Sequence, residues 1–169
     1  MTETQREKPR LKPELIWTDR LLDGLVIALM IAIWAYALGA FKNLPHTIAV
    51  HFDAQGRPDG YGGKISLMLM PALATVLALG MFVINRYPHI FNYPVKITPQ
   101  NAIYQYTLAT RLMRWINLLS TLLLGMVTHL MIASASGKFN KFWIVMIIVF
   151  TVLMFIPFLV YLVLASSKK

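Results

Sequence analysis

Residues 142–164 read FWIVMIIVFTVLMFIPFLVYLVL, a run of 23 residues without a single charged side chain. An α-helix rises about 1.5 Å per residue, so a run of this length can cross the roughly 30 Å hydrocarbon core of a bilayer. Three further apolar runs cover residues 21–41, 65–84 and 115–135. Because backbone polar groups in lipid must be satisfied within their own segment, we expect each run to be a helix. The sequence predicts an all-α membrane protein, a bundle of four transmembrane helices.

The composition leaves little room for a second domain. Hydrophobic residues make up 57% of the chain and charged residues 14%, with a mean hydropathy of +0.61, which is too apolar for a soluble domain of this size. We therefore expect a single membrane domain over residues 19–165. A disordered basic tail, residues 1–18, precedes it, and a short tail, 166–169, follows it.

The third helix is expected to be longer than its apolar run. Thr98-Pro99 has the pattern of a helix N-cap followed by proline at the first helical position, and no breaker follows until Gly125. The pattern predicts one helix over residues 99–135 whose first third projects from the membrane. Pro71 and Pro157 lie inside the second and fourth runs and are expected to kink them.

The formal net charge of +9 has two interpretations, nucleic-acid binding or contact with anionic lipid. The second is favoured because no basic soluble domain remains, so we expect the lipid bilayer as a partner and no nucleic acid.

Basic residues also orient the chain, since they favour the cytoplasmic side. Eleven lie on one predicted side and five on the other. The first set is Arg6, Lys8, Arg10, Lys12, Arg20, Arg86, Lys96, Arg111, Arg114, Lys168 and Lys169; the second is Lys42, Arg57, Lys64, Lys138 and Lys141. Both termini are therefore expected in the cytoplasm, and the loop 42–64 outside.

No cysteine occurs in the chain, which excludes disulfides, thiolate metal sites and a cysteine nucleophile. No catalytic signature was found, so we name no catalytic residue and expect no cofactor.

The loop 42–64 carries the most informative polar residues. Residues 47–53 alternate, with Ile48, Val50 and Phe52 on one face, as in a short strand with one buried face, and a glycine-rich turn follows. On this pattern His51 and Asp53 project from the other face. Such a pair can share a divalent cation, or it can be a hydrogen-bonded pair that fixes the loop. They are weak metal candidates because a zinc site needs further ligands.

His129 belongs to a ridge of small and polar residues on the third run. The ridge consists of Asn117, Thr121, Gly125, His129 and Ala133, at steps of four. An ionisable residue at this depth often marks a functional site. The alternative is a neutral histidine bonded to a backbone carbonyl, and the sequence leaves both open.

Several residues of the loop carry a resemblance to a known family. The pattern Leu44-Pro45, His51-Phe52, Gly56, Pro58-Asp59, Gly62 and Lys64 between two membrane helices resembles a bacterial membrane domain of unknown function. That domain also forms the N-terminal part of SdpI-type immunity proteins. The resemblance covers roughly residues 20–115, and Ala49 and Asp53 depart from it, since the family often has proline and asparagine there. It implies the bacterial cytoplasmic (inner) membrane and an immunity role against a peptide toxin.

Two classes of function remain. The first is a membrane protein that binds a peptide toxin or an envelope protein through loop 42–64, with contact residues His51, Asp53, Asp59, Lys64 and His129. The second is a small transporter or a metal-assisted membrane enzyme built on His51, Asp53, Asp59 and His129. Association into a homo-oligomer is left open.

Overall fold

The computed structural model describes residues 8–53 and 55–167, and within them it has four helical segments long and apolar enough to cross a membrane. The predicted four-helix architecture is thus confirmed at the level of helix length and composition. The segments are α1 (Trp17–Phe41), the 3-10 helix η1 (Lys64–Met68) with α2 (Leu69–Ile84), α3 (Ala102–Ala135), and α4 (Lys141–Leu153) with α5 (Phe155–Ser167).

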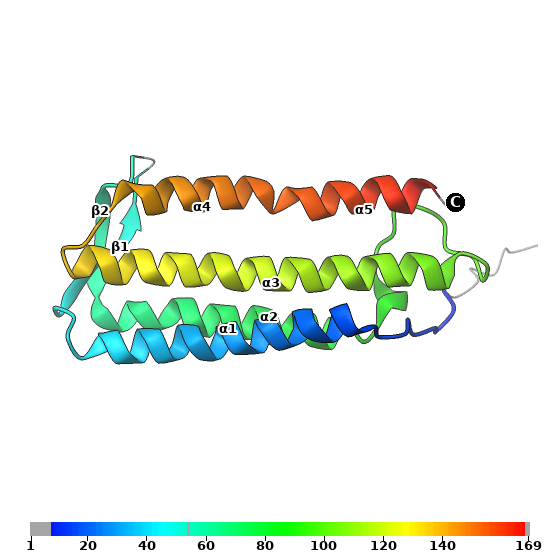
Figure 1. Cartoon of the computed structure of the whole chain (residues 1–169), viewed down its shortest axis with the longest axis horizontal. Coiled ribbons are helices and arrows are strands. Elements are labelled where there is room, and N and C mark those ends of the chain that lie inside the picture. Colours follow the sequence, from blue (N-terminus) through cyan, green and yellow to red (C-terminus); the bar gives the residue numbers. More distant parts are fainter. Residues whose placement is uncertain (1–7, 54, 168–169) are drawn as a thin grey trace, which may run out of the picture.

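The helices run along one common axis, with α3 between the pair α1–α2 and the α4–α5 segment (Figure 1). α3 contacts every other long helix, and accordingly it carries most of the buried polar residues, among them Gln105, Thr110, Asn117, Thr121 and Thr128. α4, in contrast, has no buried residue, as expected for a helix that faces lipid on most sides.

A β-hairpin lies at one end of the bundle (Figure 1). Its strands β1 (Thr47–Phe52) and β2 (Pro58–Gly63) pair antiparallel, from Thr47 opposite Gly63 to Phe52 opposite Pro58. We call this the hairpin end of the bundle. The other end, where the loop 85–101, the N-terminal segment 8–16 and the end of α5 meet, is the opposite end.

The predicted alternation within β1 is wrong at two positions, Ala49 and Val50. Ile48 and Ala49 are both buried, whereas Val50 is 38% exposed. The pairing is irregular between Ala49 and His51 and again between His51 and Phe52. Such a bulge adds an unpaired residue and breaks the period of two, so Val50 turns outward.

The two helix prolines have different effects. Pro157 follows the break between α4 and α5 at Met154, where its missing N–H leaves the carbonyl of Leu153 without an i+4 donor, as the predicted kink requires. Pro71 lies in the first turn of α2, directly after η1, where a missing N–H costs little. The second helix therefore changes from 3-10 to α geometry at this point.

The opposite end is ordered by local caps and by the N-terminal segment. Thr98 and Asn101 bond reciprocally, through Thr98 N–H to Asn101 Oδ1 at 2.8 Å and Asn101 N–H to Thr98 Oγ1 at 3.3 Å, in the manner of a capping box. Of the tail expected to be disordered, residues 1–7 lie outside the described residues. Residues 8–16 contact the bundle: Lys8 donates to the carbonyl of Phe91 at 2.6 Å, and the Tyr106 hydroxyl donates to the carbonyl of Pro9 at 3.0 Å.

Candidate functional site

The exposed side of the hairpin carries a hydrogen-bonded pair of polar side chains. His51 Nδ1 lies 2.5 Å from Asp59 Oδ1, and the two side chains are 71% and 45% exposed. The register places His51 opposite Gly60, and a Cβ on Gly60 would lie 2.9 Å from His51 Cβ. The glycine therefore makes room for His51 beside Asp59. The sequence pattern suggested Asp53 as the partner of His51, but in the structure the partner is Asp59.

Asp53 closes the hairpin turn. Its Oδ1 accepts from the Arg57 N–H at 2.7 Å, its own N–H donates to the Arg57 carbonyl at 2.9 Å, and its carbonyl accepts from the Gly56 N–H at 2.8 Å. Gly56 has φ +78°, a left-handed conformation that glycine adopts without strain. The carboxylate of Asp53 thus holds the turn, in line with the structural interpretation of this residue.

Lys64 and His129 lie apart from the exposed pair. The Lys64 ammonium donates to the carbonyl of Phe41 at 3.4 Å and lies 4.7 Å from the centre of its ring, which suits a cation at the C-terminus of α1. His129 is half-buried on α3, with Nδ1 2.9 Å from the Tyr36 hydroxyl and its ring 4.3 Å from that of Trp143.

The described part of the chain holds no group of three or more His, Asp or Glu side chains that could bind a metal. A metal at His51 would have Asp59 as its protein neighbour, and a single such pair is short of the three or four ligands of a zinc site.

The inner face of the hairpin fixes it to the bundle. Ile48 and Leu44 are buried with Ala37 of α1 and Met131 of α3. Phe52 stacks on Phe139, with ring centres 6.2 Å apart. The hairpin therefore presents His51 and Asp59 from a packed support.

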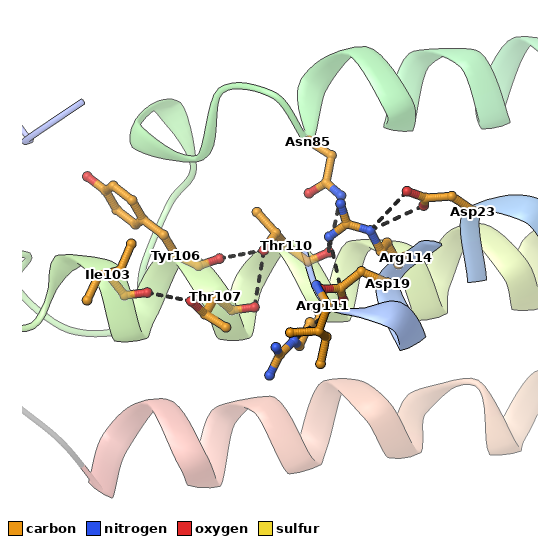
Figure 2. Close-up of polar contacts among 10 residues, drawn as sticks. Asp19, Asp23, Asn85, Ile103, Tyr106, Thr107, Thr110, Arg111 and Arg114 are labelled. Carbon is orange, nitrogen blue, oxygen red and sulfur yellow. Dashed lines mark hydrogen bonds and ion pairs between the residues drawn. The ribbon is translucent and has the colours of Figure 1, made fainter. Parts of the chain in front are cut away.

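A second polar site lies at the opposite end, and the sequence analysis did not identify it (Figure 2). Asp19, whose side chain is 3% exposed, lies between two arginines of α3, with Oδ1 3.5 Å from Arg111 Nε and 3.9 Å from Arg114 Nη1. Arg114 also pairs with Asp23 at 3.2 Å. The other oxygen of Asp19 accepts from the Ile16 N–H at 3.0 Å and so caps the start of α1. We call Asp19, Asp23, Arg111 and Arg114 the buried charge cluster.

Hydrogen bonds extend this cluster to a third segment. Arg114 Nη1 donates to the carbonyl of Thr110 at 3.3 Å, and Asn85 Nδ2, from the end of α2, donates to the same carbonyl at 3.2 Å (Figure 2). A signal for the cluster exists in the sequence: Asp19 and Asp23 are four residues apart on one helix, and Arg111 and Arg114 are three apart on another. Each pair thus shares a helix face.

Two cavities lie at the opposite end, and the first of them adjoins the buried charge cluster. One, of about 160 Å³, is lined by residues of the N-terminal segment, of the loop after α2 and of α3, including Lys12, Arg86, Arg111 and Arg114. The second, of about 310 Å³, also has Lys12 and Arg86 in its wall, together with Arg10. Four basic and two acidic side chains line the first cavity, so its surroundings favour an anion.

Comparisons with known proteins give two matches. Residues 26–75 match the model of a family described as "Domain of unknown function (DUF1648)". Over 170 aligned positions the chain is 31% identical to an uncharacterized protein from Archaeoglobus fulgidus, covering 89% of this chain and 91% of the relative. No solved structure matches the chain.

The family match falls on the hairpin end. Residues 26–75 contain most of α1, the whole hairpin and the start of α2. The buried charge cluster lies outside that range, but within a chain whose likeness to the archaeal relative extends over nearly its full length.

Proposed function

This chain belongs to the DUF1648 family, and we propose that it is a non-enzymatic, multi-pass membrane protein that binds a peptide or an envelope protein through the exposed side of its hairpin. The observation that carries the proposal is the exposed His51–Asp59 pair on a hairpin whose other side is packed against α1 and α3. A packed support reduces the conformational entropy that binding would cost.

A third side chain adds an apolar contact to this surface. Tyr61 is 67% exposed, and it lies two residues beyond Asp59 on β2. Tyrosine combines a large apolar ring with a hydroxyl and is enriched at binding hot spots. His51, Asp59 and Tyr61 thus offer a hydrogen-bonded polar pair and an exposed aromatic ring on one hairpin, which suits a polypeptide partner. An immunity role against a peptide toxin is the specific form that the family resemblance suggests.

The proposal requires the hairpin to face outward from the cytoplasmic membrane, with both termini inside. The eleven-to-five distribution of basic residues supports this orientation. Because the chain lacks cysteine, single cysteines can be placed at Gln55 on the turn and at Asn92 in the loop 85–101. An impermeant thiol reagent added to intact cells should label the cysteine at 55 and spare the one at 92. The reverse pattern would place the hairpin in the cytoplasm and contradict the proposal.

Binding is tested in a strain from which the protein has been deleted. A panel of peptide toxins and envelope stresses is first screened for one that harms the deletion strain. The strain is then complemented with the wild type, His51→Ala, Asp59→Ala or Lys138→Ala and challenged again. Lys138→Ala is the control, because it removes a charge at the same end of the bundle. A photo-crosslinking amino acid at position 61 reports the partner directly. We expect His51→Ala and Asp59→Ala to lose both protection and the cross-linked product at unchanged expression, whereas Lys138→Ala keeps them. If all three variants protect as the wild type does, the hairpin pair has no binding role.

One observation favours the transporter as the alternative. His129 and Tyr36 form a hydrogen bond between two membrane-length helices, and polar groups at that depth often belong to ion or substrate paths. The packing around them is close, however, since a Cβ at Gly125 of α3 would lie 3.1 Å from Ile33 of α1. Saturable solute uptake into proteoliposomes that is lost in His129→Ala and kept in His51→Ala would establish transport instead of binding.

A further inference from the structure

We infer that the opposite end of the bundle binds a phosphate group between Lys12 of the N-terminal segment and Arg86 of the loop after α2. These are the two basic residues that line both cavities at this end. The site is separate from the hairpin and does not depend on the function proposed for it.

The N-terminal segment forms one wall of the first cavity and is held in place by the rest of the chain. The Lys8–Phe91 and Tyr106–Pro9 hydrogen bonds fix its start, and the Asp19 carboxylate fixes its end through the Ile16 N–H. Lys12 lies between these attachments, so its position beside Arg86 follows from contacts on both sides of it.

The charges at this site do not cancel. Asp19 and Asp23 face Arg111 and Arg114 within the buried charge cluster. Among the described residues, Lys12 and Arg86 form no ion pair, and Glu14 is the remaining carboxylate in the wall of the first cavity. Arg10, in the wall of the second cavity, adds a further positive charge. Lysine and arginine together are suited to a phosphate, the first as a point charge and the second through paired N–H groups.

Arg111 adds a further basic side chain to the wall of the first cavity. Arg111 Nε is buried and makes no hydrogen bond within the described residues, although it lies 3.5 Å from Asp19 Oδ1. Its side chain is 38% exposed and lines the first cavity. Asp19 Oδ1 is likewise buried without a hydrogen bond, so Nε and this carboxylate oxygen are ionic partners. What Arg111 contributes to the first cavity is the positive charge of its partly exposed side chain.

The level of the site in the membrane fits a phosphate. α1 begins at Trp17 and α2 ends at Ile84. Most of the residues that line the first cavity lie just before the start of α1 and just after the end of α2. Trp17 and Trp115 are 73% and 46% exposed, as expected of aromatic residues at a membrane interface. Arg111 is four residues from Trp115, about 6 Å along α3. Basic pockets at this level bind lipid headgroups, and soluble phosphate would use the same groups.

The test measures the thermal midpoint of the full-length protein in detergent against added anion. One arm titrates phosphatidylglycerol into phosphatidylcholine micelles, and the other titrates inorganic phosphate against chloride at equal ionic strength. Lys12→Gln/Arg86→Gln is compared with Lys138→Gln/Lys141→Gln, which removes the same charge at the hairpin end. Each basic residue near an anionic group contributes a factor of about five in affinity. We therefore expect the concentration for half-maximal stabilisation to rise about 25-fold in the first double variant and to stay at the wild-type value in the second.

Each outcome decides the inference. Stabilisation by phosphatidylglycerol alone identifies the ligand as a lipid headgroup, and stabilisation by inorganic phosphate as well identifies a soluble phosphate, provided that both depend on Lys12 and Arg86. Equal loss in the two double variants would show a general effect of surface charge and overturn the site. A wild-type midpoint that responds to neither anion would overturn it too.

Discussion

The two ends of the bundle each contain an acid–base pair, and the pair with the longer distances is the more buried one. At the hairpin end, His51 and Asp59 are 2.5 Å apart with side chains 71% and 45% exposed. At the opposite end, Asp19 lies 3.5 Å and 3.9 Å from two arginines, but its side chain is 3% exposed. Water screens the first pair more than the second, because the Asp19 carboxylate is buried, so the longer contacts should matter more to stability. The shorter contact remains available to a partner.

The two pairs also differ in how they are assembled. His51 and Asp59 are eight positions apart on one hairpin, whereas Asp23 and Arg114 are 91 positions apart. The first pair needs only local structure, while the second exists only when α1 and α3 have packed. The hairpin end is thus suited to recognition and the opposite end to holding the bundle together.

The largest expected effect is at Asp19. Asp19→Ala leaves Arg111 and Arg114 without their shared counter-charge and removes the acceptor of the Ile16 N–H, so we expect a loss of about 3–5 kcal/mol in the free energy of unfolding. The matched change at the hairpin end, Asp59→Ala, should cost at most about 1 kcal/mol. Both are measured by denaturant unfolding in mixed micelles. Equal losses of unfolding free energy in the two variants would contradict the view that the pair at the opposite end is structural and the hairpin pair is not.

The second effect tests the support of the hairpin. Ile48 is 1% exposed and packs with Leu44 and Met131, so Ile48→Ala should cost about 2–4 kcal/mol in the same unfolding measurement. Val50→Ala, at the outward-turned position of the bulge, should change stability by roughly 0.5 kcal/mol or less. Comparable losses at the two positions would mean that Ile48 and Val50 share the buried face, as the regular alternation predicts, and that the bulge does not form.

The third effect concerns the hairpin turn. Gly56 and Gly137 both have positive φ, but a Cβ at Gly56 would lie 2.7 Å from Ile144 Cγ1, whereas one at Gly137 would meet nothing within 4 Å. Gly137→Ala should therefore destabilise the protein by backbone strain alone, about 1 kcal/mol. Gly56→Ala has the same strain and also a steric clash with α4, which should cost about 1–3 kcal/mol more. Thermal midpoints of the two variants provide the measurement. If the two midpoints fall by the same amount, the hairpin turn at Gly56 is not in contact with Ile144 of α4.

The sequence predicted the elements that depend on local pattern. Helix length follows from the apolar runs, and the break in the fourth segment follows from Pro157. The predicted start of the third helix at residue 99 is three residues early, because α3 begins at Ala102 with Asn101 at the N-cap position. Each of these features involves residues within a few positions of one another. The fold class was therefore accessible before any tertiary contact was known.

The features that the sequence analysis got wrong or missed depend on contacts between separate segments of the chain. The outward turn of Val50 and the choice of Asp59 over Asp53 depend on the bulged pairing with β2, which alternation within β1 cannot reveal. The buried charge cluster needed the relative positions of α1 and α3. Asp23 and its partner Arg114 are 91 positions apart, so their pairing could not be identified from α1 alone.

The smallest effect is a pH dependence at the opposite end. Burial raises the pKa of the Tyr93 phenol above its usual value of 10.0, and the neighbouring Tyr106 and Tyr161 raise it further. The folded protein then keeps this proton while the unfolded chain releases it, so the unfolded state binds fewer protons above pH 10 and stability falls as pH rises. A single such group contributes about 1 kcal/mol of loss by pH 11.

Tyr93→Phe isolates this contribution, since phenylalanine keeps the ring but has no phenol to ionise. The variant also loses the hydrogen bond to the Pro88 carbonyl at 2.7 Å, which lowers its stability at every pH, so the quantity to compare is the change between pH 8 and pH 11. We expect that change to be smaller in Tyr93→Phe than in the wild type by about 1 kcal/mol. Tyr87→Phe, at a side chain 49% exposed on the same loop, serves as the control and should match the wild type. A Tyr93→Phe profile parallel to the wild type would mean that this ring is not buried against α3 and α5. The opposite end would then owe its stability to the buried charge cluster without help from the aromatic contacts beside it.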